Sequence, residues 1–402
     1  MTMKLRNRLL ALACLLLFLT LGGLIFLTTG TRKPFAVILF VADNINPACL
    51  SATRIYSGGG EARLQLEEFP NTALCRNSSS DFSVPDTAAA STEIAAGAKA
   101  PNGKLCIDPS GAKLPSLLEE ASLKGRATAL ITTGSLLSPS AAAFFAKTAD
   151  PSNTREILGQ FLSHPPFDMA VGFATDQETS ANCAPKETQL IRSPGELEAF
   201  PFWKRNPVTA LLPSPSNQAT GITEESSSLS DLVRIAIRRL QLNRKGYLLV
   251  VDDPGIGAAA AANDGEKMLG KISAFDKAIA TARRYAGDNA MIVVTGRENI
   301  GGFQLNGHPF LHDKGVAVVA LDNRGYPSLC WSTGPGYAIE APQDGKAKKG
   351  SPGILTQPSA FLLPKGIPTS GDVLAAGLGE GTDRIHGFLD LTDLHRIIRE
   401  SL

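Results

Sequence analysis

Short apolar runs, several of them ending on charged residues, constrain the fold of this chain more than any other feature. They are AVILFVADN (36–44), ATALITTGS (127–135), DMAVGF (168–173), GYLLVVDDPG (246–255), NAMIVVTGREN (289–299) and GVAVVALD (315–322). Continuous apolar runs of this length are typical of central strands in a parallel sheet, because such strands are buried on both faces. We therefore predict that each run forms one strand.

Helical patterns lie between these runs, for example at 114–125, 228–242 and 271–286. Strands that alternate with helices predict an α/β fold with a doubly wound, mostly parallel central sheet and helices on both faces. Such sheets bind ligands outside the carboxyl ends of their strands. Asp43, Asp252 and Glu298 all lie at such predicted ends, so we expect these side chains to converge.

Length and charge limit how many domains the chain can form and which kinds of partner it can bind. The 402 residues carry 39 basic and 38 acidic side chains, a net charge of +1, with no basic stripe that would suggest nucleic acid. Residues 34–402 are predicted to form one domain, with a loop-rich insertion of little regular structure near 172–230 and a second loop at 341–360. The sequence leaves open whether the chain has a protein partner or forms a homo-oligomer.

The N-terminus predicts a membrane anchor at residues 1–33. Basic residues flank an uninterrupted apolar run, 9–27, which at about 1.5 Å per residue nearly matches a hydrocarbon core of about 30 Å. We expect an uncleaved signal anchor, with the main domain outside the cytoplasm in the periplasm or at the cell surface; a cleaved signal peptide is the alternative. An oxidising compartment allows one or two disulfides among the cysteines beyond this segment, and buried free thiols are the equal alternative.

The stretch SVPDTAAASTEIAAGAKAPNG, 83–103, contains the candidate nucleophile. Pro85 keeps the preceding residue extended, so either Asp86 or Thr87 can cap a helix that continues to about Ala96. The N-terminus of a helix attracts phosphate, and an activated hydroxyl there can attack phosphorus. From this stretch alone, Thr87 is either a nucleophile or an ordinary helix cap.

The order of these segments resembles the alkaline phosphatase family over residues 34–402. The resemblance is carried by FVADNIN, VPDTAAASTEIAAGAKAPNG, ITTGSLLSPSAAAFFA, YLLVVDD, IVVTGREN, and the C-terminal GDVLAAGLGEG and HGFLDLTDLHRIIRESL. It implies that family's fold, phosphate ester hydrolysis, a Ser or Thr nucleophile, two zinc ions and one magnesium ion.

Part of the family's site is kept under this resemblance. Asp43 matches the aspartate that bridges two metals, and Thr87 matches the nucleophile. Ser140 and Asp252 match the threonine and glutamate that bind magnesium, and Ser138 matches an Asp or His. These oxygen ligands suit a single magnesium ion better than zinc.

The zinc positions are mostly replaced. Gly257 and Ala261 match an Asp and a His, Arg297 and Glu298 match the family's Asp-His pair, and Pro368 falls near the late His. The arginine that clamps phosphate in the family matches Pro151. We therefore expect the two-zinc site to be absent. Arg297 becomes the candidate phosphate-binding residue, and Glu298 a candidate metal ligand with Asp43, Ser140 and Asp252; the alternative is that these residues only hydrogen-bond one another and Arg297.

Three hypotheses follow. The first is a membrane-anchored alkaline-phosphatase-like protein with lost or strongly reduced two-zinc chemistry, which binds a phosphorylated small molecule or a protein. The second is an active phosphomonoesterase that uses Thr87 and one Mg²⁺. The third is a structural or interaction module of the cell envelope. Fold alone does not decide among them.

Overall fold

The computed structural model describes residues 7, 11–22, 34–163, 165–174, 184–213, 228–307, 309–320, 327–338 and 357–402. Of the predicted anchor, residues 11–22 are helical, and the rest of the apolar run lies outside the described residues. Within the described ranges, no helix combines the length and the apolar character needed to span a bilayer.

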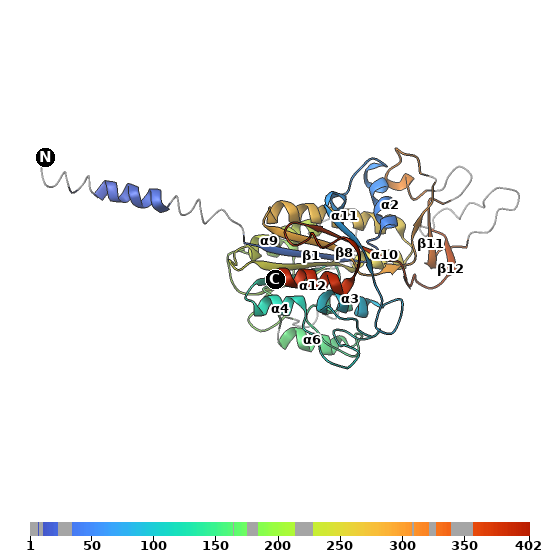
Figure 1. Cartoon of the computed structure of the whole chain (residues 1–402), viewed down its shortest axis with the longest axis horizontal. Coiled ribbons are helices and arrows are strands. Elements are labelled where there is room, and N and C mark those ends of the chain that lie inside the picture. Colours follow the sequence, from blue (N-terminus) through green and yellow to red (C-terminus); the bar gives the residue numbers. More distant parts are fainter. Residues whose placement is uncertain are drawn as a thin grey trace.

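A twisted, mostly parallel sheet forms the centre of the domain (Figure 1). Its strands, in spatial order, are β15 (Gly387–Asp390), β2 (Asn71–Arg76), β14 (Val373–Leu378), β8 (Ala290–Gly296), β1 (Ala36–Ala42), β7 (Tyr247–Asp253), β3 (Ala127–Thr132), β4 (Met169–Ala174), β6 (Val208–Pro213) and β5 (Gln189–Ile191). Among these strands, β14 is antiparallel to both of its neighbours and the other pairs are parallel. The α/β prediction is confirmed.

Helices cover both faces of the sheet (Figure 1). One face packs against α2 (Pro47–Gly58), η1 (Gln65–Glu68), α8 (Pro194–Ala199), α9 (Leu229–Leu240), α10 (Pro254–Ala261) and α11 (Gly265–Ala286). The other packs against α3 (Thr87–Ala96), α4 (Leu117–Leu123), α5 (Pro139–Ala142), α6 (Thr154–Ser163) and α12 (Leu391–Ser401).

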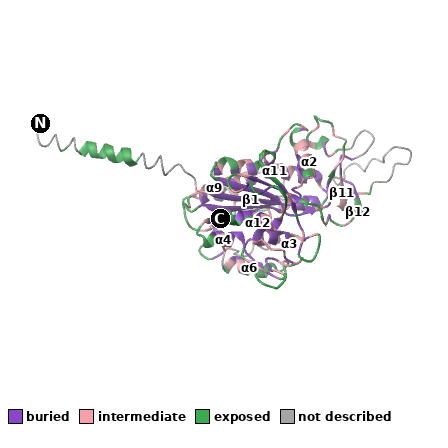
Figure 2. Cartoon of the chain, in the orientation of Figure 1, coloured by how far each residue is buried: buried purple, intermediate pink, exposed green. Residues whose placement is uncertain are grey.

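Alternation along β1 divides the core between these two layers. Ile38 and Phe40 lie in the α9 and α11 layer, whereas Val37 and Leu39 lie in the α3 and α12 layer. Every residue of β1 is buried, and Figure 2 shows the sheet as the most buried part of the molecule. Burial on both faces is the reason that this strand is a continuous apolar run.

Small strands lie beyond the carboxyl ends of the main sheet. They are β10 (Gln304–Leu305), β11 (Leu329–Gly334) and β12 (Ser359–Leu362), with the pair β9 (Asn299–Ile300) and β13 (Pro368–Thr369). The strand predicted at 315–322 is wrong over its described part, where Gly315–Ala317 forms a single 3₁₀ turn, η3, beside α2. Val316 is 65% exposed, so this apolar run is not a buried strand.

The prediction of little regular structure near 172–230 is also wrong in part. This stretch contains the end of β4, then β5, α8 and β6, which extend the sheet at one edge. Residues 175–183 and 214–227 lie outside the described residues. Among the cysteines that the structure describes, all are free thiols: Cys14, Cys49, Cys75, Cys106 and Cys330.

Candidate functional site

Strand register brings the candidate residues to one edge of the sheet. Val41 of β1 lies opposite Asp252 of β7, and Ala42 lies opposite Gly296 of β8. Asp43 and Arg297 are the next residues along their strands, so parallel pairing places them side by side. The expected convergence is confirmed.

Arg297 forms the centre of the cluster. Its Nε donates to Asp43 Oδ1 at 2.9 Å, and its Nη1 donates to Asp252 Oδ1 at 2.7 Å. The Nη2 atom lies 2.8 Å from the same Asp43 oxygen. All three side chains are almost completely buried, so the guanidinium lies inside the protein as a fixed counter-charge for two carboxylates.

Hydroxyl groups hold the other oxygen of Asp252. Ser140, in α5, donates to Asp252 Oδ2 at 2.9 Å, and Thr132, at the end of β3, donates to it at 2.8 Å. Ser138 lies 3.0 Å from Ser140, oxygen to oxygen. Sequence reasoning did not include Thr132 in the site, although its place at the end of a central strand was a usable signal.

Thr87 joins the cluster through Glu298. Asp86 is the helix cap, because its Oδ1 accepts from the amide of Ala89 at 2.8 Å. Thr87 is therefore the first residue of α3, and its hydroxyl donates to Glu298 Oε1 at 2.6 Å. The alternative that Thr87 is itself the cap is excluded, while its role as a nucleophile stays a prediction.

Burial controls the charge of this cluster. Three carboxylates share one guanidinium, so full ionisation would leave uncompensated negative charge in a dry site. Burial raises the pKa of Asp43 to about 8 against the opposing effect of Arg297, and it raises the pKa of Glu298 as well. Burial opposes the charged form of Arg297, but the carboxylates of Asp43 and Asp252 outweigh it and raise its pKa, so the guanidinium stays charged. Burial and the charge of Arg297 therefore act in opposite directions on the pKa values of Asp43 and Glu298.

A pair of zinc ions does not fit these side chains. The nitrogens of Arg297 occupy the positions beside Asp43 and Asp252 where a cation would be bound. At Gly257, a Cβ atom would lie 2.1 Å from Asp43 Oδ2, so a carboxylate ligand has no room there while Asp43 keeps its orientation. Across the described ranges, no group of three or more His, Cys, Asp or Glu side chains is arranged to hold a metal ion.

The described histidines lie away from the cluster or are engaged elsewhere. The ring of His395 contacts the Ile94 carbonyl with Nδ1 at 3.0 Å, and His312 and His386 lie in other segments, near η3 and before β15. His164 and His308 lie outside the described residues. The structure pairs Arg297 with Asp43 and Asp252, and its role in binding phosphate stays a prediction.

Comparison with known protein families shows to which family this chain is related. The model of the alkaline phosphatase family matches residues 35–162 and 210–402. The chain belongs to the alkaline phosphatase family. Residues 163–209, which carry β4, β5 and α8, lie outside the match.

Relatives of this alkaline phosphatase family member are distant. The tissue-nonspecific alkaline phosphatase of Gallus gallus is 24% identical over 373 residues, which cover 75% of this chain and 71% of that protein. Alkaline phosphatase 4 of Bacillus subtilis is 24% identical over 294 residues, which cover 67% of this chain and 62% of that protein.

Solved structures share the fold. Alkaline phosphatase from the Antarctic bacterium TAB5 superimposes with a TM-score of 0.69 at 18% identity, covering 92% of this chain and 98% of that one. The cold-active alkaline phosphatase of Shewanella sp. gives 0.70 at 17% identity, covering 92% and 100%. The fold of this family member is therefore that of a phosphoesterase, while its site carries Arg297 at the centre.

Proposed function

We propose that this protein is a membrane-anchored, extracytoplasmic member of the alkaline phosphatase family whose two-zinc hydrolysis is lost or strongly reduced, and that it binds a phosphorylated small molecule. The observation that carries the proposal is the position of Arg297 between Asp43 and Asp252. A permanent positive charge repels a nearby metal dication, by about 8 kcal/mol at 4 Å with an effective dielectric of about 20.

Ligand binding in this proposal depends on the N-terminus of α3. Its first turn offers backbone N–H groups and a partial positive charge, which favour a phosphate group. Thr87 and Ser138 are the partly buried hydroxyl residues of the cluster, and Thr87 is the one of them that lies in the first turn of α3. Membrane attachment is supported by the apolar run 9–27 and its basic flanks.

A second candidate is an active phosphomonoesterase with one Mg²⁺. The 2.6 Å hydrogen bond from Thr87 to Glu298 favours it, since a nucleophile beside a carboxylate base is the arrangement that such chemistry needs. Asp43, Ser140 and Asp252 would hold the metal, which would supply charge neutralisation at the phosphate oxygens. Arg297 now binds two of those residues, so this candidate requires its guanidinium to withdraw.

Metal analysis beside a phosphatase assay separates the two candidates. The full chain, purified in detergent, is measured for bound metal and for hydrolysis of p-nitrophenyl phosphate with added zinc or magnesium. We expect no tightly held zinc and very slow hydrolysis that zinc does not rescue. Magnesium-dependent turnover that Thr87→Ala abolishes would support the phosphomonoesterase, and two tightly held zinc ions with zinc-dependent turnover would overturn the first proposal.

A further inference from the structure

A basic cleft lies at the edge of the sheet opposite the candidate site. It has a volume of about 790 Å³ and is formed by the segment before β6, Asp168 before β4, and the end of α9 with the loop that follows. All these segments adjoin the amino ends of parallel strands. Its lining carries four cationic side chains, Lys204, Arg205, Arg239 and Arg244, against the single carboxylate of Asp168.

Arg239 supplies an unsatisfied donor to this cleft. The residue is only 8% exposed, its Nη2 donates to the Asn206 carbonyl, and its guanidinium stacks over Phe200 at 5.5 Å. Among the described residues, its buried Nη1 has no hydrogen-bond partner. A buried donor without a partner is costly. Nη1 is closed off from solvent, so an anionic oxygen in the cleft would reach it only when the guanidinium turns outward, and would then form a charge-assisted bond.

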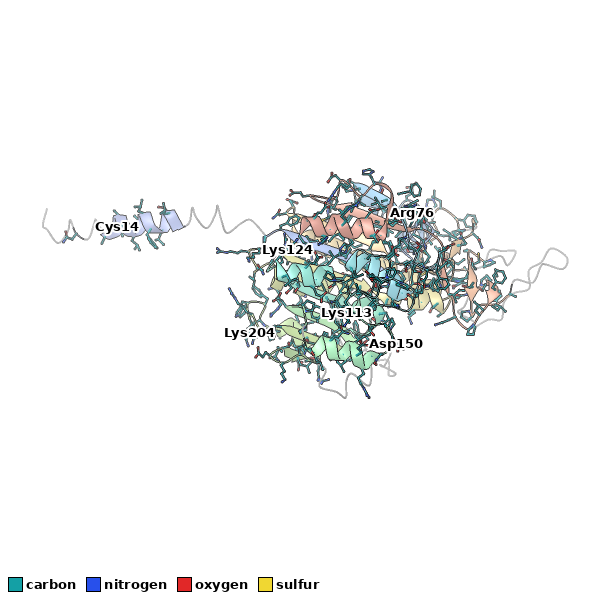
Figure 3. The ribbon with its side chains drawn as sticks, turned by 60° about the horizontal axis from the view of Figure 1, so that its bottom comes forward. Cys14, Arg76, Lys113, Lys124, Asp150 and Lys204 are labelled. Carbon is teal, nitrogen blue, oxygen red and sulfur yellow. The ribbon has the colours of Figure 1, made fainter. Side chains whose placement is uncertain are left out.

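Exposed apolar side chains surround the cleft. Trp203 is 65% exposed and Leu242 is 51% exposed, and both line it. Leu123, 87% exposed, is the last residue of α4, and the loop that follows it is tied to the cleft by a 3.0 Å hydrogen bond from Asn243 to the Gly125 carbonyl. Figure 3 shows Lys124 and Lys204 at this same end of the domain.

The chain enters the domain at this same edge. Phe35 precedes β1, and its carbonyl accepts from the amide of Tyr247 at 3.2 Å, directly after the loop that carries Leu242 and Arg244. Only residues 28–33 separate the apolar run from Pro34, and that length of chain spans at most about 20 Å. An anchor formed by that run therefore holds this edge close to the bilayer.

We propose that this edge docks on the membrane surface and that the cleft binds the phosphate of an anionic phospholipid headgroup. The proposal rests on the membrane attachment proposed above. Lys and Arg side chains are attracted to anionic headgroups, and tryptophan is favoured at the membrane interface. The loop with Trp203, Lys204 and Arg205 lies in the stretch that the alkaline phosphatase family model does not match, whereas Arg239 and Arg244 lie inside the matched range.

Tryptophan quenching in vesicles tests the proposal. The chain has two tryptophans, and Trp331 is 2% exposed in the core, so it supplies an unquenched background. The full chain is reconstituted into vesicles whose lipids carry bromine on the upper acyl chain. We expect the brominated lipids to quench the fluorescence of Trp203 strongly when phosphatidylglycerol is present and weakly in phosphatidylcholine alone. A Trp203→Phe variant should show only the fluorescence of Trp331, without quenching.

Charge variants identify the cause of docking. Replacement of any one of the exposed residues Lys204, Arg205 and Arg244 by Gln is expected to lower the equilibrium constant for docking about fivefold. The triple Gln variant should therefore lose most of the quenching.

A matched control replaces exposed basic residues outside this edge, Arg63, Lys113 and Arg155, and should quench like the wild type. Arg239→Gln is expected to reduce quenching too, and a folded Arg239→Gln protein that quenches fully would remove the cleft from the proposal.

Flotation of the vesicles tests the membrane anchor and the docking surface separately. A chain that floats with the vesicles but shows no quenching of Trp203 overturns the docking surface and leaves the anchor intact. A chain that does not float overturns the anchor and the docking surface together.

Discussion

Thr87 Oγ1 and Glu298 Oε1 lie 2.6 Å apart, so one hydrogen bond joins the first residue of α3 to the end of β8. Glu298 is 1% exposed, and its second oxygen has no hydrogen-bond partner among the described residues. Thr87 is therefore the side-chain donor on which the buried carboxyl group depends.

Replacing Thr87 should cost stability as well as any activity. Thr87→Val removes the donor and is expected to lower the free energy of unfolding by about 1–3 kcal/mol, because a buried carboxyl group loses its partner. Thr87→Ser keeps a hydroxyl and should cost less. Urea denaturation measures both, and a Thr87→Val protein as stable as the wild type would contradict the importance of this bond.

Removing the guanidinium should be more severe. Arg297→Met leaves Asp43 and Asp252 buried without a counter-charge, which is expected to cost about 3–5 kcal/mol of unfolding free energy. Adding Asp43→Asn should recover part of that loss. Because Arg297→Met frees oxygen ligands that suit Mg²⁺, added magnesium should raise the melting temperature of this variant and leave that of the wild type unchanged.

Gly257 provides a test of the space beside Asp43. Gly257→Ala places a methyl group against the carboxylate, 2.1 Å from its oxygen in the present structure, and is expected to cost about 1–3 kcal/mol. Gly270 is the matched control, since it lies inside α11 and a Cβ there meets nothing within 4 Å. Gly270→Ala should stabilise the protein by about 0.5–1 kcal/mol, and thermal unfolding of the two variants distinguishes the positions.

The buried carboxyl group of Glu93 is expected to make the free energy of unfolding depend on pH. Both of its carboxylate oxygens are buried in α3 without hydrogen-bond partners among the described residues. Burial raises its pKa from 4.5 to about 8, with Lys99 opposing the shift and Asp390 adding to it. Between those values the folded chain holds a proton that the unfolded chain has released, so the contribution of Glu93 to stability is greatest below pH 4.5 and falls as the pH rises towards 8.

Glu93→Gln removes that titration. Its unfolding free energy is expected to fall less between pH 5 and pH 8 than that of the wild type. Glu61→Gln, at an exposed position, should leave the dependence unchanged. Equal pH profiles for Glu93→Gln and the wild type would show that Glu93 is not the group responsible.

The central strands were predictable because two-sided burial leaves a distinct pattern in sequence. β1 and β7 are apolar along their length and end on carboxylates, and parallel register then fixes which residues meet. The run at 315–322 has the same composition, yet Val316 is exposed beside α2. Apolar composition alone does not show what a segment packs against. A similarly apolar run therefore forms a turn at this position.

The site was predictable as a set of residues and less so as an arrangement. Strand order indicated that Asp43, Asp252 and Glu298 would converge, and hydrogen bonds from these residues to Arg297 were the stated alternative. The inward direction of Arg297 is set by its hydrogen bonds to Asp43 and Asp252, which are a property of packing that local sequence does not encode. The basic cleft was missed for a similar reason, because Arg239 and Trp203 are separated along the chain and become neighbours only when α9 packs beside the segment before β6.

If two-zinc chemistry was lost from this site, as proposed above, the closeness of Gly257 to Asp43 makes that loss hard to reverse. A carboxylate restored at 257 would collide with Asp43 as it now lies, and an aspartate restored at 297 would leave buried acids with no cation. Each single reversion is therefore unfavourable until the other is in place. Under that proposal, regain of the metal chemistry by single substitutions would pass through a destabilised intermediate.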